Sequence, residues 1–313
     1  MGYKLAGCRV VLANDIDPVM ASHYARNLPG TPIEVCPIKD IPTSSLPSNV
    51  DILDGSPPCS TFSMAGNREK DWGVNKRFAE GQAKQVLSDL FFDYLDLAEK
   101  VRPKVLIAEN VTGILLGNAK LYSKRIVDRM RALGYRTQVF QLDAADCGVP
   151  QHRKRVFFCG VRKDVSDAPL VLKPNSPWVS AGAACRDVQT ATAEDAVDNS
   201  LDPEETHIRF WARARKGQSY NRVAAKQLGK VSWFNFIRLD DRKPACTLAA
   251  SHHNYAHWSE LRMLNCMEWR RLGSFPDDYA ADNPATLKYL IGMSVPPRMM
   301  EFVASEVRKQ WLS

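Results

Sequence analysis

A cysteine behind two prolines is the first residue whose type and position suggest chemistry. Residues 51–63 read DILDGSPPCSTFS, and the apolar start of this segment predicts a strand that ends shortly before Cys59. Pro57 and Pro58 fix the backbone ahead of the cysteine, so its thiol is held in one direction. Open α/β sheets build their active sites at the carboxyl ends of strands, which makes Cys59 a candidate nucleophile. A buried structural cysteine beside a rigid turn is the alternative.

An acid and two arginines follow at the ends of later apolar runs. Residues 105–111, VLIAENV, predict a buried strand that places Glu109 at the same edge, as an acid, a base or a hydrogen-bond anchor. Helix capping is the alternative. Residues 148–160, GVPQHRKRVFFCG, set Gln151, Arg153 and Arg155 at alternating positions, which predicts that both arginines face the same way. Two guanidinium groups suit a phosphate and a base carbonyl, although a solvated strand edge carries alternating charges as well.

Strands and helices must position these side chains. In the first half of the chain, short apolar runs alternate with helical patterns, and this alternation predicts such elements. We expect strands over residues 9–13, 50–53, 104–108, 135–142 and 156–161. We expect helices over residues 18–28, 83–101 and 119–133, and a closing helix over residues 296–312. The predicted fold class is therefore α/β, with a doubly wound, mostly parallel sheet and a smaller second domain.

The periodicity fades after residue 162 and returns at residue 261, which predicts a separate middle lobe over residues 163–260. Within it, residues 207–230 contain Lys and Arg but no Asp or Glu, and aromatic side chains are interleaved with the basic ones. Such a mixture suits a nucleic-acid surface, although a solvated helix face is the other explanation. The residues that we expect to contact DNA phosphates are Arg209, Arg213, Arg215 and Lys216.

Composition narrows the class of protein. The 313 residues are 45% hydrophobic and 25% charged, which favours a folded globular chain over a disordered or fibrous one. Lys and Arg number 42 against 35 Asp and Glu, and the net charge of +7 favours a polyanionic partner. The eight cysteines form no C-x-x-C pair, so we expect free thiols and no metal site. We find neither a signal peptide nor a membrane-spanning run, and we expect a cytoplasmic protein.

Four motifs in a fixed order give the chain a resemblance to a known family. PPCSTFS, ENV, QHRKR and GMSVPP follow one another as in the C5-cytosine-specific DNA methyltransferases, and NDID and LGSFPDDY also fit. The resemblance covers nearly the whole chain except the middle lobe, where this family has its target-recognition domain. It implies a catalytic core over residues 1–162, a target-recognition domain over residues 163–260 and a segment over residues 261–313 that returns to the core.

The resemblance also implies a reaction. Members transfer a methyl group from S-adenosylmethionine to C5 of a cytosine that is flipped out of double-stranded DNA. By resemblance, the catalytic residues are Cys59, which attacks C6, Glu109, which holds N3 and the exocyclic amine, and Arg153 and Arg155. Arg155 would hold the O2 carbonyl, while Arg153 and the DNA-binding Gln151 would order the neighbouring loop and backbone.

Cofactor contacts follow from the same resemblance. Asp15 would accept the two ribose hydroxyls, and Ile16 would pack on adenine. The rest of the cofactor pocket would be lined by Ile38, Leu90, Ser294 and Val295, with ordinary apolar packing as the alternative for these four.

The sequence departs from the family at three places near the cofactor. Pro37 stands where an aspartate is usual, and Met293 replaces an asparagine, so each position loses a cofactor hydrogen bond. The family opens with a strand and a glycine-rich turn that have no counterpart here. We therefore expect the core to lack its first strand and S-adenosylmethionine to bind poorly.

Two other interpretations stay open. A tRNA cytosine-5 methyltransferase would share Cys59 and Glu109, although the basic middle lobe favours DNA. A DNA-binding remnant without activity is the second, and a methyl-transfer assay separates it from an enzyme. We expect a monomer, encoded by a bacterium or phage, with a restriction endonuclease that acts on the same site as its candidate partner.

Overall fold

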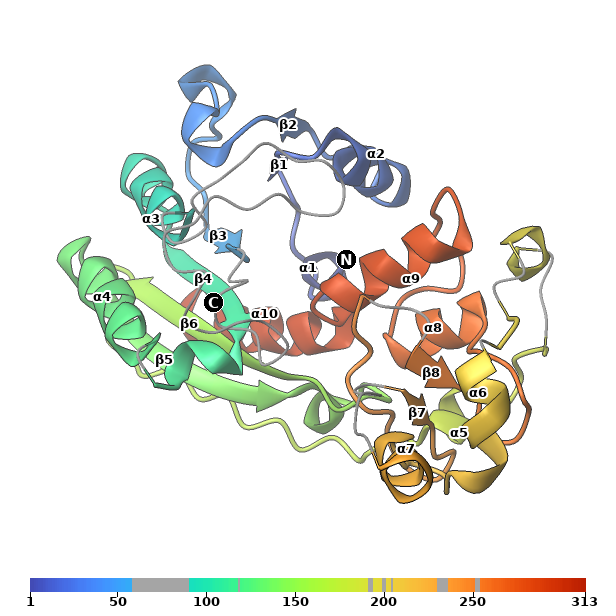
Figure 1. Cartoon of the computed structure of the whole chain (residues 1–313). Helices are drawn as coiled ribbons and strands as arrows, with labels where there is room; N and C mark the ends of the chain where they lie inside the picture. The colour runs from blue at the N-terminus through green and yellow to red at the C-terminus, as the bar shows by residue number, and fades with distance from the viewer. Residues whose placement is uncertain are drawn as a thin grey trace. The chain divides into compact units, whose positions relative to one another are not determined.

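The computed structural model describes residues 1–57, 90–117, 119–190, 194–198, 201–203, 205–229, 236–250 and 254–313. These residues form two compact units. Figure 1 shows the chain coloured from its N-terminus to its C-terminus. The sheet unit consists of Ala6–Leu142, Lys154–Lys173 and Val303–Ser313. The second unit consists of Met1–Leu5, Asp143–Arg153 and Pro174–Phe302.

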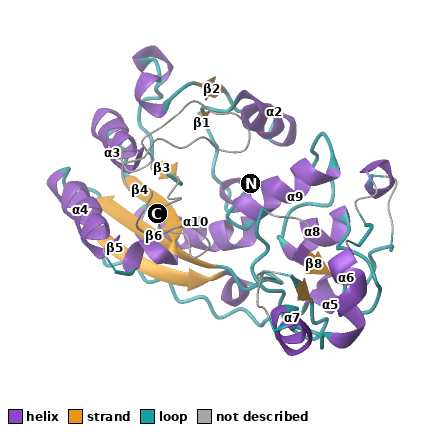
Figure 2. Ribbon diagram, viewed as in Figure 1, coloured by secondary structure: helices purple, strands orange, loops and turns teal. Residues whose placement is uncertain are grey.

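The strands of the sheet unit form two groups. β1 (Ala13–Asp15) pairs in parallel with β2 (Ile33–Val35). The other strands, in the order β3-β4-β6-β5, form a four-stranded sheet: β3 (Ile52–Gly55), β4 (Val105–Val111), β5 (Tyr135–Asp143) and β6 (Lys154–Arg162). Figure 2 shows these strands in orange, and within the described ranges no ladder joins β1 to β3.

The predicted α/β class is confirmed, with two differences in the strands. β6 runs antiparallel to β4, whereas β3 runs parallel to it, so the four-stranded sheet is mixed. The first strand lies at Ala13–Asp15 and not over residues 9–13. A pattern of apolar residues encodes neither the direction of a strand nor its exact ends, which accounts for the first and the second difference respectively.

Three helices accompany the strands of this unit: α2 (Pro18–Asn27), α3 (Leu90–Val101) and α4 (Ala119–Ala132). α2 begins where the carboxylate of Asp17 accepts the backbone N–H groups of Val19 and Met20, which satisfies donors that the helix cannot. α3 and α4 bury their apolar sides in one cluster with strand residues, in which the rings of Phe91 and Phe158 meet edge to face at 5.6 Å. This cluster holds β4 and β6 in place.

Tyr94 of α3 bridges two neighbouring strands. Its hydroxyl lies 2.9 Å from the carbonyl oxygen of Leu53 in β3 and 3.0 Å from that of Ile107 in β4. Gly55 leaves room for the phenol ring, because a Cβ atom there would lie 2.6 Å from it. α3 is therefore fixed against the two strands that precede Cys59 and contain Glu109.

The second unit is mostly helical. Its elements are α1 (Gly2–Leu5), α5 (Ala181–Ala184), α6 (Glu205–Phe210), α7 (Asn221–Leu228), β7 (Ile237–Arg238), β8 (Tyr255–Ala256), α8 (Cys266–Leu272) and α9 (Pro284–Met293). β7 and β8 pair in parallel. α10 (Pro297–Trp311) begins in this unit and ends in the sheet unit.

The compact units differ from the predicted domain boundaries. Residues 143–153 and 261–302 group with most of the middle lobe, whereas the prediction placed both in the catalytic core. The reason is packing: Trp269 and Leu287, from α8 and α9, are buried in one cluster with Leu239 and Leu248 of the middle lobe. A helix pattern predicts an apolar face but not the cluster that covers it.

Candidate active site

Glu109 and Arg155 meet on one face of the four-stranded sheet. In the antiparallel pairing of β4 and β6, Arg155 lies opposite Val111, which places it diagonally across from Glu109 on the same face. Arg155 Nε is 2.8 Å from Glu109 Oε1, and the two side chains are only 13% and 9% exposed. The sheet therefore holds a carboxylate and a guanidinium group together and largely out of water.

Burial and charge act on Arg155 in opposite directions. Desolvation lowers the pKa of its guanidinium, and the carboxylate of Glu109 raises it again. Nη1 donates to the carbonyl oxygen of Lys154 at 2.8 Å. Within the described part of the chain, Nη2 has no hydrogen-bond partner of its own, so it can donate to a bound molecule.

Asn110 connects this strand to the segment before Cys59. Its Nδ2 donates to the carbonyl oxygen of Pro57 at 3.1 Å, and its Oδ1 accepts the backbone N–H of Val111 at 2.9 Å. Cys59 itself lies outside the described residues. The sequence places Asn110 beside Glu109 in the ENV motif, and the structure shows that Asn110 fixes the backbone two residues ahead of the candidate nucleophile.

Asp15 lies at the carboxyl end of β1, as predicted for the ribose-binding acid. Its Oδ1 accepts the backbone N–H of Asp17 at 2.9 Å, and burial raises the pKa of Asp15 while this hydrogen bond opposes the shift. The preceding Asn14 donates from Nδ2 to the carbonyl oxygens of Glu34 and Cys36, each at 2.9 Å. These bonds fix the end of β1, next to the partly buried Ile16.

The other four predicted cofactor residues are divided between the two units. Ile38 packs against the core cluster of the sheet unit and lines a cavity of about 500 Å³ beside α3. Leu90 is the first residue of α3. Ser294 and Val295 belong to the second unit, where the Ser294 hydroxyl donates to the carbonyl oxygen of Leu290 at 2.7 Å. Ile38 thus packs against the core and also borders open space, and the four cofactor contacts stay predictions.

Gln151 and Arg153 are buried within the second unit, where both hydrogen-bond to backbone groups. Gln151 is 2% exposed; it donates to the Leu272 carbonyl at 3.2 Å and accepts the Leu248 N–H at 3.1 Å. Arg153 is also 2% exposed and donates to the carbonyls of Leu248 and Gly292, at 2.8 and 2.7 Å. Arg153 precedes β6, outside the strand alternation from which a shared direction with Arg155 was predicted. The DNA contact of Gln151 and the catalytic role of Arg153 stay predictions.

Comparisons with known proteins agree with the motifs. Residues 1–309 match the family model described as C-5 cytosine-specific DNA methylase. The chain belongs to this family. It is 28% identical over 364 residues to the type II methyltransferase M.DdeI of Desulfomicrobium norvegicum, covering 98% of this chain and 85% of that protein. It is 30% identical over 332 residues to M.NgoPII of Neisseria gonorrhoeae, covering 99% and 92%.

Solved structures support the same fold. A mutant of DNMT2 from Spodoptera frugiperda superimposes with a TM-score of 0.66 at 16% identity, covering 98% of this chain and 95% of that one. The resemblance predicted from the four motifs is therefore confirmed, and the methylase family and its fold are established for this chain.

The basic segment of this family member is mostly exposed. Arg209, Arg213 and Arg215, in and after α6, have exposed side chains. Lys216 differs, because its Nζ lies 2.7 Å from Asp241 Oδ1 and both side chains are partly buried. Residues 207–230 contain no acid, and the acidic partner of Lys216 lies further along the chain.

Arg238 organises this segment and was not predicted. It donates to the carbonyls of Trp211 and Ala214, at 3.2 Å each, and to that of Trp258 at 2.8 Å from Nη2. Its guanidinium carbon also lies 3.8 Å from the ring centroid of Trp211, a cation-π contact. In the sequence, Arg238 is one basic residue outside the basic run, so only the fold identifies it.

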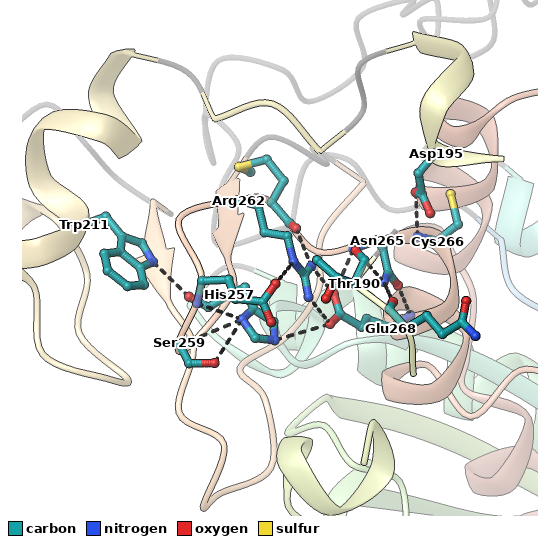
Figure 3. Close-up of polar contacts among 12 residues, drawn as sticks. Thr190, Asp195, Trp211, His257, Ser259, Arg262, Asn265, Cys266 and Glu268 are labelled. Carbon is teal, nitrogen blue, oxygen red and sulfur yellow. Dashed lines mark hydrogen bonds and ion pairs between the residues drawn. The ribbon is translucent and has the colours of Figure 1, made fainter. Parts of the chain in front are cut away.

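A buried polar network fixes the connection between β8 and α8 (Figure 3). Glu268 receives both Nη atoms of Arg262, at 2.9 Å each, and the backbone N–H of Asn265 at 2.8 Å. His257 Nε2 lies 3.4 Å from the same carboxylate. Each of these charged or polar groups is nearly inaccessible to water, and the carboxylate is satisfied from several sides.

His257 is held as a neutral ring. Its Nδ1 accepts the backbone N–H groups of Ser259, at 3.3 Å, and Glu260, at 3.1 Å, so Nε2 carries the proton that faces Glu268. Burial lowers the pKa of His257 to about 4, and the charge of Arg262 acts in the same direction. The network therefore depends on an uncharged imidazole.

Within the described ranges, no helix combines the length and apolar character needed to cross a membrane. The same residues contain no group of three or more His, Cys, Asp or Glu side chains placed to bind a metal ion. The described cysteines are free thiols.

Proposed function

We propose that this protein transfers a methyl group from S-adenosylmethionine to C5 of cytosine in double-stranded DNA. The observation that carries the proposal is the buried ion pair between Glu109 of β4 and Arg155 of β6. Asn110, next to Glu109 in β4, ties this strand to the backbone before Cys59. Cytosine presents N3, an exocyclic amine and the O2 carbonyl along one edge. A carboxyl group and a guanidinium group side by side can hydrogen-bond to that edge in one orientation.

The chemistry begins with Cys59. Its thiolate forms a bond to C6, and the electron pair of the C5–C6 double bond makes C5 nucleophilic. Glu109 hydrogen-bonds to N3 and the exocyclic amine and so favours protonation at N3 as charge builds on the ring. Arg155 donates from Nη2 to O2. Once C5 had taken the methyl group, water would accept the C5 proton, and the C–H electron pair would restore the C5–C6 double bond. The bond from C6 to sulfur would break with its electron pair staying on the sulfur of Cys59.

Asp15 has the chemistry of a cofactor ligand. One oxygen of its carboxylate is held by the backbone of Asp17, and a carboxylate placed in this way can accept hydroxyl groups such as those of a ribose. S-adenosylmethionine supplies an electrophilic methyl group when it is bound. Ile16 would pack on the adenine, with Leu90, Ser294 and Val295 as further contacts.

Covalent trapping tests the function. In duplex DNA of mixed sequence in which 5-fluorocytosine replaces cytosine, the fluorine cannot leave as a proton does, so Cys59 should remain attached to the base. We expect a covalent adduct by denaturing gel electrophoresis with the full chain and S-adenosylmethionine, and none with Cys59→Ala. Cys8→Ser is the matched control, because Cys8 is a partly exposed free thiol of the same unit.

The same assay separates the alternatives. Methylation of tRNA but not of DNA would assign the protein to RNA, and DNA binding without either product would indicate a remnant. An adduct that persists in Cys59→Ala would overturn the proposed nucleophile. A cognate restriction endonuclease and a monomeric state belong to the same proposal, and they are tested by DNA cleavage in the source cell and by sedimentation.

A further inference from the structure

The first half of α4 presents two uncommitted lysines and two exposed leucines. Lys120 and Lys124 lie one helical turn apart, both side chains are exposed, and neither has an ion pair within the described ranges. Leu116, just before the helix, is 50% exposed, and Leu121 is 70% exposed. We call Leu116, Lys120, Leu121 and Lys124 the α4 surface (α4 in Figure 1).

Two basic residues further along α4 already have partners. Arg129 lies 3.1 Å from Asp96 and 2.6 Å from Glu99, both on α3. Arg125 lies over the ring of Phe92, at 5.0 Å from its centroid. These contacts pack α4 against α3, while Arg131, in the last turn, is exposed. Packing inside the sheet unit therefore explains Arg125 and Arg129 but not the two lysines.

The α4 surface is rigidly connected to the strand that carries Glu109. The 3-10 turn Thr112–Leu115 follows β4 directly and leads into α4. Ser123 joins this turn to the helix, because its hydroxyl contacts the carbonyl oxygens of Ile114 and Ala119. Ile114 is fully buried. The surface therefore has a fixed position relative to the candidate catalytic edge.

We propose that the α4 surface contacts the DNA duplex that flanks the target cytosine, an inference that rests on the proposed function. Lys120 and Lys124 would each neutralise a backbone phosphate, and Leu116 and Leu121 would pack against the sugars beside them. The duplex fits better than a protein partner, because its backbone phosphates supply a regular row of negative charges for two lysines that lack acidic partners within the described ranges. Asp128, the acidic residue of α4, lies one turn beyond Lys124.

The experiment measures the salt dependence of binding between the full chain and a mixed-sequence duplex. Lys120→Gln with Lys124→Gln should lower the slope of log K against log salt by about 1.8, since each phosphate contact contributes about 0.9. Between 50 and 200 mM salt, the wild type should therefore lose about 12-fold more affinity than the variant. Leu116→Ser with Leu121→Ser should weaken binding at every salt concentration without changing the slope.

The matched control is Lys100→Gln with Lys309→Gln. These lysines are exposed on α3 and α10, and their loss changes the net charge by the same amount. The control should keep the wild-type slope. An equal loss of slope in both double variants would overturn the inference, because net charge alone would then explain the effect.

Methyl transfer by the wild type into the same duplex distinguishes this inference from the proposed function. Transfer together with an unchanged slope in the α4 variant would overturn the inference alone. No transfer and no binding by the wild type would overturn both. Self-association of the wild type that is lost in the variant, with an unchanged slope, would identify the surface as a contact between copies and also overturn the inference.

Discussion

Arg155 Nε lies 2.8 Å from Glu109 Oε1, and the two side chains are 13% and 9% exposed. Each charge stabilises the other where water cannot, so removal of one partner leaves the other uncompensated. The pair therefore has two separable effects, one on folding and one on the reaction. Variants of each residue and of both together can resolve these effects.

We predict that Glu109→Gln lowers kcat by about 10²- to 10⁴-fold, the usual contribution of a positioned proton donor or acceptor. Arg155→Ala should lower the free energy of unfolding by about 3 kcal/mol, because a buried carboxylate loses its partner. The double variant should be less destabilised than the sum of the single ones. Urea unfolding and single-turnover methyl transfer measure the two effects.

Arg162→Ala is the control for this pair. Arg162 lies on the same strand and pairs with Asp164, which is 66% exposed, so its loss should cost less than about 1 kcal/mol. Full activity in Glu109→Gln would contradict the assigned role of the carboxyl group. Additive losses of stability in the double variant would show that the two side chains do not interact in solution.

In the basic segment, residues 207–230, we predict that the exposed arginines contact DNA phosphates and that Lys216 stays paired with Asp241. Neutralising Arg209, Arg213 and Arg215 together should lower the slope of log K against log salt by about 2.7, since three phosphate contacts are lost. Lys216→Gln should leave the slope nearly unchanged, because Asp241 already neutralises this lysine. Fluorescence anisotropy over a salt series measures both. A change of about 0.9 for Lys216→Gln would mean that DNA displaces Asp241.

Local signals predicted two helices of the sheet unit, α2 and α4, well, whereas the short helices of the second unit were not predicted. The prolines, glycines and apolar spacing around α2 and α4 indicate their ends, and the observed bounds, Pro18–Asn27 and Ala119–Ala132, differ from the predicted ones by one residue at the carboxyl end. Gly134, at φ of 92°, takes the left-handed conformation that follows a helix, which its position after the apolar pattern indicates. Such signals are short in range and can be read without the fold.

Among the site residues, those placed by local signals were predictable and those placed by distant contacts were not. Glu109 was predictable because it ends a buried strand, and its partner Arg155 lies in a strand of the same sheet. The contacts of Arg153 were not predictable, because its partners are the carbonyls of Leu248 and Gly292, which lie 95 and 139 residues away in the sequence. The sequence gives no sign of which distant carbonyl a buried arginine satisfies. Motif identity therefore predicts the type of chemistry better than the position of each side chain.

Arg153 provides a test of stability that is separate from DNA binding. Arg153→Ala removes charged donors from two buried carbonyl oxygens and should lower the free energy of unfolding by about 3 kcal/mol. The salt dependence of DNA binding should stay at the wild-type value. Lys154→Ala, at the exposed neighbouring position, is the control and should change neither quantity. A stable Arg153→Ala protein without methyl-transfer activity would instead support the predicted catalytic role of Arg153.

His257 should make the protein sensitive to acid in a defined range of pH. In the unfolded chain an ordinary histidine binds a proton near pH 6.5, whereas burial lowers the pKa of His257 to about 4 in the folded protein. Between these values the unfolded state binds more protons, so the free energy of unfolding should fall as the pH decreases, by at most about 3 kcal/mol. Protonation would also remove the Nδ1 acceptor that the backbone N–H groups of Ser259 and Glu260 use.

Urea unfolding from pH 7 to pH 4 should show this loss of stability in the wild type and a flatter profile in His257→Gln. His152→Gln, at a ring that is 37% exposed, is the matched control and should keep the wild-type slope. An equal slope in the wild type and His257→Gln would assign the acid sensitivity to another group.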